Sequence, residues 1–236
     1  MTTHSGMWLE DLAWPEAAQR FAEGAVVLLP VGAASKAHGP HLPLKTDALT
    51  ARALAQRLLE RLPLVAAPVV GVGFYPAFAA FAGSQHLSES TFRAVMGELV
   101  DGLRRQGARR LAILNVGVST EAPIDAVCAG ASDILVLHMR ALGGAAEALI
   151  EVRDGGHADE RETSVVLALE PRAVRLDRLA PEGPFEKTAA TGDARRATAF
   201  KGERLLAARV NDAVTALLAR WPDLAGPHLA SPHLAS

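Results

Sequence analysis

The chain has 236 residues, of which 50% are hydrophobic and 21% are charged, and its formal net charge is −2. This size and composition fit one globular domain, and the near-neutral charge excludes a broad electrostatic attraction to nucleic acid or to an anionic membrane surface. The single cysteine, Cys128, excludes an internal disulfide, and the first residues lack the basic and apolar regions of a signal peptide, so we expect a cytoplasmic protein.

Hydrophobic periodicity predicts helices and strands in alternation. Helices are predicted over 15–23, 48–62, 88–107 and 197–220, and strands over 26–29, 64–72, 110–114 and 133–139. Such alternation predicts a parallel sheet that binds ligands beyond the carboxyl ends of its strands. We therefore expect a single-domain, three-layer α/β/α fold with a mostly parallel sheet over residues 1–225. The repetitive segment 226–236 is predicted to be a flexible tail or a packing arm.

The loop after the first predicted strand carries His38, His41 and Asp47. Glycine and prolines within this loop prevent a regular helix and restrict the backbone. Two imidazoles and a carboxylate in a rigid loop at a strand end are suited to hold a divalent metal ion. A proline-rich turn with satisfied polar groups is the alternative interpretation.

A second polar cluster, His157, Glu160 and Glu162, opens a predicted helix. An imidazole and two acids at a helix start are suited to metal binding or proton transfer. Acidic residues also favour helix N-termini for electrostatic reasons alone, which is the alternative here.

The segment between these two clusters is aromatic and rich in glycine, and it is predicted to be an active-site loop. Tyr75 and Phe78 are its candidate substrate contacts. His86 is either a replacement metal ligand, a substrate contact or an ordinary loop histidine.

The string HGPHLPLKTD, preceded by LPVG, and the string GHADERETS resemble the signatures of the creatininase family of metal hydrolases. The resemblance implies a creatininase-like fold and an amidohydrolase with a divalent ion, either zinc, manganese or iron. It implies that His38, Asp47 and Glu162 are metal ligands and that His157 transfers a proton near the scissile amide. Glu160 is a further catalytic candidate, and His41 is expected to orient a ligand or to contact substrate. The resemblance also implies a homo-oligomer, with a hexamer among the forms expected.

Two positions depart from the family pattern. Lys36 stands where the family has a glutamate, and Asn115, Val116 and Gly117 stand where it has an NGH motif. A lysine beside the site repels a second cation, so we expect one ion rather than two, with Lys36 acting on the substrate. His86 and Glu121 are alternatives that could replace the missing ligands, and Ser119 and Glu121 are candidate substrate contacts. Loss of the metal altogether is the third possibility.

Three functions follow. The first is a metal-dependent amidohydrolase that cleaves the carbon–nitrogen bond of a small non-peptide amide, either cyclic or linear. The second is a catalytically altered binding or regulatory protein on the same fold, which the two departures favour. The third is a peptide-trimming metallohydrolase whose cleft is lined by the aromatic loop.

Overall fold

One parallel sheet organises the fold, in a computed structural model that describes residues 6–179 and 183–225. Its five strands are ordered β1-β3-β2-β4-β5, and all four pairings between them are parallel. The strands are β1 (Met7–Trp8), β2 (Val26–Val31), β3 (Val65–Ala66), β4 (Arg110–Asn115) and β5 (Ile134–His138). The predicted parallel sheet is therefore confirmed.

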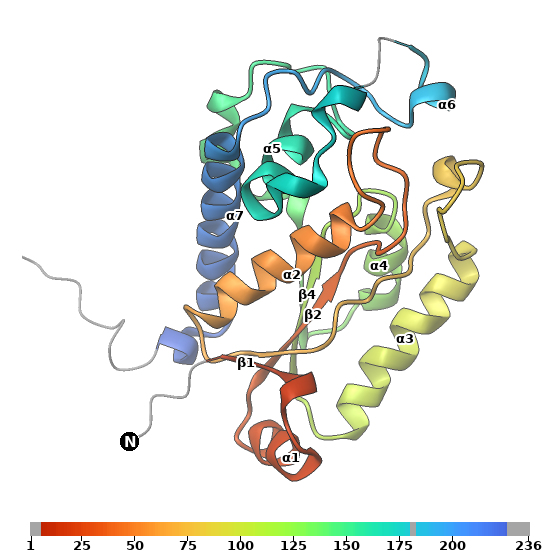
Figure 1. Cartoon of the computed structure of the whole chain (residues 1–236). Coiled ribbons are helices and arrows are strands. Elements are labelled where there is room, and N and C mark those ends of the chain that lie inside the picture. The colour runs from red at the N-terminus through yellow and green to blue at the C-terminus, as the bar shows by residue number, and fades with distance from the viewer. Residues whose placement is uncertain (1–5, 180–182, 226–236) are drawn as a thin grey trace, which may run out of the picture.

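Helices cover both faces of this sheet (Figure 1). They are α1 (Trp14–Ala22), α2 (Thr46–Leu59), α3 (Glu89–Arg105), α4 (Glu121–Cys128), α5 (Glu160–Leu169), α6 (Phe185–Thr188) and α7 (Ala199–Arg220). One apolar cluster joins the sheet to α2, α5 and α7, and a second joins it to α3 and α4. The expected three layers, helix, sheet and helix, are thus present.

Strand β2 lies in the middle of both cores. Its side chains alternate between the two apolar clusters, with Val26 and Leu28 in one and Val27 and Leu29 in the other. All six residues of β2 are buried, which explains why the strand reads as an uninterrupted apolar run instead of an alternating one. The loop that follows β2 consequently begins at a fixed point at the carboxyl edge of the sheet.

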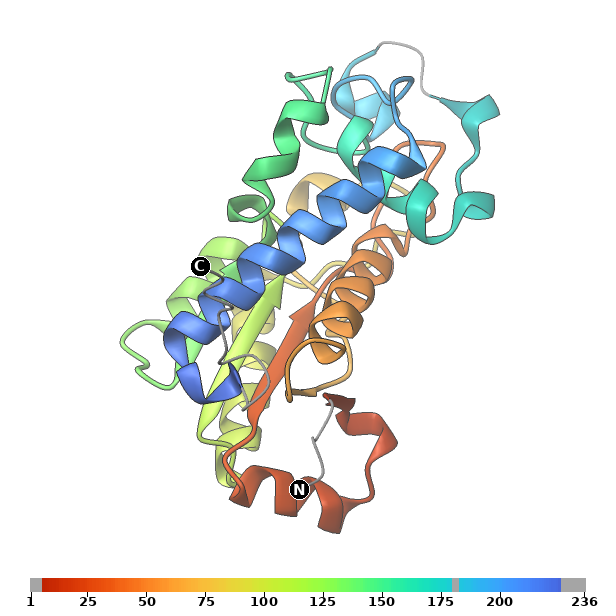
Figure 2. The same cartoon turned by 90° about the vertical axis from the view of Figure 1, so that its left-hand side faces the viewer.

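Helices α5 and α7 cross in backbone contact, and α7 runs in front of the strands in Figure 2. A Cβ atom built on Gly202 of α7 would lie only 1.9 Å from the carbonyl oxygen of Ser164 in α5. Glycine is therefore required at this crossing. The Ser164 Oγ accepts a hydrogen bond of 3.1 Å from the amide of Thr198, at the start of α7.

Several element boundaries differ from the sequence-based expectations. Strand β3 covers only two residues because Pro68 has no amide hydrogen for the ladder, although Val70 still donates to Pro30 of β2 at 2.9 Å. Ser88 caps α3 by accepting from the amide of Thr91. Strand β1 and helix α4 were not predicted. The predicted tail, 226–236, lies outside the described residues.

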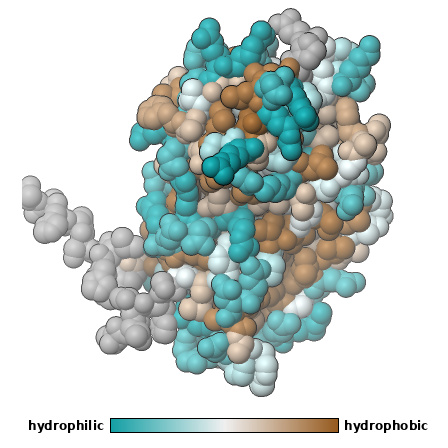
Figure 3. Space-filling model, viewed as in Figure 1, coloured by the Kyte–Doolittle hydropathy of each residue, from teal (hydrophilic) through white to brown (hydrophobic). Residues whose placement is uncertain are grey.

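Polar residues cover much of the face drawn in Figure 3, with apolar residues showing between them. In residues 6–179 and 183–225, none of the helices combines the length and the apolar character needed to cross a lipid bilayer.

Candidate active site

The loop after β2 is held close to the start of α2. A Cβ on Gly32 would lie 2.5 Å from the backbone oxygen of Asp47, so this glycine permits the close approach of strand end and helix start. Gly39 adopts a φ of 63°, in the left-handed region, and its amide donates to the carbonyl of Ala189 at 2.8 Å. The loop is therefore held where its two ends meet, at Gly32 and Asp47, and again near its middle, at Gly39.

Three side chains of this loop form a buried charged group. The Lys36 Nζ lies 2.6 Å from one carboxylate oxygen of Asp47, and the Nε2 atom of His38 lies 2.9 Å from the other. The Nδ1 atom of His38 donates to the carbonyl of Lys36 at 2.8 Å, since a carbonyl only accepts. The Nε2 atom of His38, which faces Asp47, therefore has two possible states. Either it carries a second proton and donates to the carboxylate, or it has a lone pair, and a cation must then separate that lone pair from the carboxylate oxygen.

The start of α5 supplies the second group. Asp159 caps the helix by accepting hydrogen bonds from the amides of Arg161 and Glu162. Ala158 has a φ of 51°, unusual for a residue with a side chain, and its amide donates to Glu162 Oε2 at 2.5 Å. This turn directs His157 and Glu162 toward each other, with 3.5 Å between His157 Nδ1 and Glu162 Oε2.

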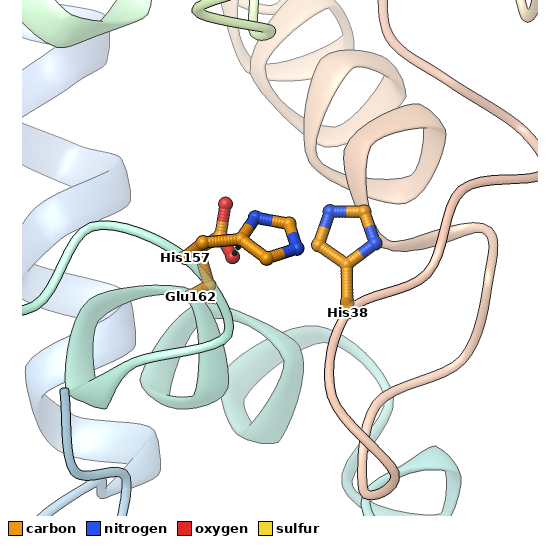
Figure 4. Close-up of side chains that lie close together, drawn as sticks. All are labelled: His38, His157 and Glu162. Carbon is orange, nitrogen blue, oxygen red and sulfur yellow. Dashed lines mark ion pairs between the residues drawn. The ribbon is translucent and has the colours of Figure 1, made fainter. Parts of the chain in front are cut away.

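His38, His157 and Glu162 converge from these two segments (Figure 4). Each can offer one ligand atom, and these atoms lie within 4.8 Å of one another. Two ligands bound at about 2.1 Å to one ion lie at most about 4.2 Å apart, so a small side-chain rotation would complete a shared site. Asp47 is not in this cluster of three but contacts it through His38.

The two histidines have the hydrogen bonds typical of metal ligands. The Nε2 atom of His157 donates to the carbonyl of Ala37 at 2.8 Å, which leaves its Nδ1 lone pair facing Glu162. The ring nitrogen of His38 that donates to Lys36 is anchored in the same way. Such backbone contacts fix the tautomer and the orientation of a ligating imidazole. The residues present therefore fit one divalent ion.

Burial and charge shift the pKa values of these groups. Burial and then the nearby charges of His38 and Lys36 lower the pKa of His157 to about 3, so its imidazole is neutral at physiological pH. Burial acts to raise the pKa of Asp47, but Lys36 and His38 outweigh it and hold that pKa well below its usual value. Asp47 is consequently a weak base and a permanent anion.

A cavity of about 430 Å³ opens beside this cluster and is lined by Lys36, Asp47, His157 and Glu162. Phe78 forms one wall, with its ring centroid 4.5 Å from that of His157. This volume lies within the range of small-molecule sites, about 300–1,000 Å³. Ser119, a predicted substrate contact, also lines the cavity.

Glu160 does not join the cluster. Its side chain is fully buried, accepts from the amides of Glu151 and Val152, and forms an ion pair with Lys201. Both carboxylate oxygens are occupied by these contacts. The structure thus gives Glu160 a structural position instead of the predicted catalytic one.

His41 also lies apart from the cluster of three. Its Nε2 atom is 2.9 Å from the hydroxyl of Thr163, and it lines a different cavity from the one beside Glu162. Burial lowers the pKa of His41, so this ring too is held neutral. The contact between His41 and Thr163 joins the loop after β2 to α5.

The remaining candidates lie around the cavity or away from it. The Tyr75 hydroxyl donates to the carbonyl of Gln85, and the ring lines a small space beside Lys36. His86 donates to the carbonyl of Leu87 and does not belong to the metal-ligand cluster. Glu121 begins α4 and forms an ion pair of 2.5 Å with Arg140. His86 and Glu121 therefore do not replace missing ligands in this arrangement.

Five charged residues that line the cavity were missed from the sequence: Arg140, Glu147, Asp159, Arg161 and Arg209. Arg209 lies on the buried face of α7, beside Leu205, Leu206 and Val210. A charged residue at an apolar position of an amphipathic helix was the signal available in the sequence.

Comparisons with known proteins agree with this architecture. The family model described as creatininase, creatinine amidohydrolase, matches residues 10–217. A creatinine amidohydrolase of Pseudomonas putida is 26% identical, with 92% of this chain and 98% of that protein covered. A mycofactocin precursor peptide peptidase of Mycobacterium tuberculosis is 31% identical, with 83% and 85% covered. A solved structure described as "Creatininase Mn" superposes with a TM-score of 0.80 at 25% identity, covering 91% of this chain and 98% of that one. The chain therefore belongs to the creatininase family.

Proposed function

We propose that the chain is a metal-dependent amidohydrolase that cleaves the carbon–nitrogen bond of a small amide. The observation that carries this proposal is the convergence of His38, His157 and Glu162 within 4.8 Å beside a cavity. Zinc, manganese and iron all accept such mixed nitrogen and oxygen ligands.

When bound, a divalent ion polarises the amide carbonyl and lowers the pKa of a water molecule from about 15.7 towards 7. The protein's own residues hold and orient the reactants. Phe78 and its aromatic neighbours Phe81 and Phe185 exclude water from one side of His157. Lys36, whose Nζ lies 5.0 Å from the centre of the Phe78 ring, presents a positive charge to the cavity.

His157 fits the role of a ligand better than that of a proton carrier. Its Nε2 atom is committed to the carbonyl of Ala37, and its pKa of about 3 strongly disfavours the protonated ring. A proton carrier works best with a pKa near the operating pH. His157 is therefore a metal ligand in this proposal, in place of the proton-transferring role that the family resemblance implies.

One ion fits better than two. The Lys36 ammonium lies 2.6 Å from one carboxylate oxygen of Asp47 and would repel a second cation there. Because the Nδ1 atom of His38 is committed to the carbonyl of Lys36, its Nε2 atom is the one left for the ion, and the other carboxylate oxygen of Asp47 lies 2.9 Å from it. The proposed centre is thus one ion on His38, His157 and Glu162, with Asp47 as a neighbouring anion.

Two alternatives keep specific support. The Lys36–Asp47 ion pair favours a binding protein without hydrolysis, because it satisfies a carboxylate that a metal centre would otherwise use. The similarity to a mycofactocin precursor peptide peptidase favours a peptide-like substrate instead of a non-peptide one. Homo-oligomerisation and a cytoplasmic location remain predictions.

Metal analysis of the purified protein tests the proposal. After growth with zinc, manganese and iron, we expect about one equivalent of metal per chain, and less than about a tenth of an equivalent would favour the binding protein. His38→Ala should lose both the metal and amide hydrolysis. His86→Ala is the matched control and should keep both, because His86 lies outside the cluster. Retention of metal by His38→Ala would show that the ligands are misassigned.

A further inference from the structure

Arg209 carries a buried guanidinium that no protein group neutralises directly. The residue is only 7% exposed and lies on the core-facing side of α7. Its Nε atom is buried without a hydrogen-bond partner, and none of its nitrogens hydrogen-bonds or ion-pairs with a residue in the described parts of the chain. A buried charge left in this state is costly to the folded protein. Because the unpaired guanidinium of Arg209 lines a cavity, a ligand in that cavity could supply the missing hydrogen-bond acceptor.

The other cations of the cavity are already paired. Lys36 pairs with Asp47, and Arg140 pairs with Glu121. Arg161 contacts Glu147 at 2.9 Å and Asp159 at 3.0 Å. Each of these positive charges therefore has a carboxylate within direct contact, in contrast to Arg209.

The carboxylates that face Arg209 are also committed. Glu147 and Asp159 are held by Arg161, and Glu162 accepts from the amide of Ala158 in the candidate metal cluster. These three acids attract Arg209 at longer range but do not contact it within ion-pair distance. Arg161 shares Glu147 and Asp159, and an ion would occupy Glu162, so the guanidinium of Arg209 has no carboxylate in direct contact although negative charge lies nearby.

We infer that Arg209 is the anchor for a carboxylate group of the substrate, so that this site acts on small amides carrying a free carboxylate. The inference rests on the proposed function and adds the substrate class to it. The planar guanidinium binds a carboxylate through two parallel hydrogen bonds, a geometry that a lysine at this place would not provide. Met139, Leu142 and Val116 supply apolar lining of the same cavity.

The metal-loaded protein is titrated with two probes, N-acetylglycine and its uncharged analogue N-acetylglycinamide, in a calorimeter. We expect the carboxylate to bind at least about tenfold more tightly than the amide. In Arg209→Met this preference should vanish while the metal content is unchanged, and Arg209→Lys should restore it only in part. Arg204→Met is the matched control, since Arg204 is an exposed arginine of the same helix.

Because Arg209→Met removes a buried unpaired charge, the ligand-free variant should have a melting temperature equal to or higher than that of the natural protein. A lowered melting temperature would indicate misfolding, which this measurement separates from a loss of binding. Equal binding of both probes by the natural protein overturns the inference, as does a preference that survives in Arg209→Met. Tighter binding of inorganic phosphate than of N-acetylglycine overturns the carboxylate assignment. Absent metal and absent turnover would instead refute the proposed hydrolase, and the probe titration would still decide the role of Arg209.

Discussion

The candidate site contains two imidazole–carboxylate pairs that differ in how their charge is balanced. His38 and Asp47 lie 2.9 Å apart in a fully buried group that Lys36 neutralises. His157 and Glu162 lie 3.5 Å apart beside the cavity and have no lysine between them. In the first pair Lys36 already balances the carboxylate, whereas the second offers a lone pair and an unbalanced anion to an incoming cation. The loop after β2 thus contributes one ligand, His38, from a group whose charge is already balanced, and we call His38–Asp47 the supporting pair. The start of α5 contributes the negative charge that a cation would bind, and we call His157–Glu162 the receiving pair.

The largest effect is expected where the receiving pair is broken. Glu162→Gln keeps the size of the side chain and its acceptor for the amide of Ala158 but removes the negative charge. We expect loss of bound metal and a fall in turnover of at least about 100-fold, measured by elemental analysis and steady-state kinetics.

Glu160→Gln is the control for this change, because Glu160 lies two residues away in the same helical turn. It should retain metal and turnover and should instead lower the free energy of unfolding by about 1–3 kcal/mol, through its contact with Lys201. Equal metal loss in both variants would remove the distinction between the two acids.

The supporting pair is tested through Lys36. Lys36→Met leaves Asp47 buried without its cation, and we expect the metal-free protein to lose about 3–5 kcal/mol of unfolding free energy in chemical denaturation. Added manganese should recover part of this loss, since a second cation can then approach Asp47. An unchanged metal stoichiometry, together with no recovery, would contradict the assigned role of Lys36.

The receiving pair also predicts a pH dependence of stability. His157 binds its proton near pH 3 in the folded chain but near 6.5 when unfolded, so the unfolded chain holds more protons between these values. The stability that His157 contributes is complete above about pH 6.5 and is lost as the pH falls towards 3. Denaturation of the metal-free protein should show this as at most about 1.4 kcal/mol per pH unit, a slope that His157→Gln reduces. The same slope in both proteins would assign the acid sensitivity to other groups.

The smallest effect is expected at the second histidine of the HGPH sequence. His41 contacts Thr163 and lies outside the cluster, so His41→Gln should cost about 1 kcal/mol of stability and leave metal content unchanged. Thermal unfolding and elemental analysis measure both quantities. Metal loss in this variant would return His41 to the ligand set.

The sequence predicted the sheet, the main helices and both polar segments, because each has a strong periodic or motif signal. The family resemblance separated Glu162, as a metal ligand, from Glu160, but the residues alone could not show that Glu160 faces away from the site. Successive helical residues are about 100° apart, so two acids at i and i+2 point in nearly opposite directions, and only one can face a cavity. Which one does so depends on how α5 packs against α7, a contact between segments distant in sequence.

Other features escaped because their signal is too short or non-local. Strand β1 has two residues, fewer than a period-2 pattern needs to be detected. The pairing of Lys36 with Asp47 joins residues that only the folded loop brings together. Arg209 had a local signal, but its lack of a partner is a property of the packed helix.

The glycine at the crossing of α5 and α7 has a mechanical consequence. Gly202 lets the backbones of α5 and α7 come into contact, so sliding of one helix along the other would cause a steric collision. The two helices are therefore expected to move together as one rigid unit. Glu162 of α5 and Arg209 of α7 both belong to this rigid unit, so the distance between their backbones stays constant. Any widening that admits a substrate would therefore come from lining residues outside these two helices, such as Phe78, which sits in a short turn of 3-10 helix on the connection between β3 and α3.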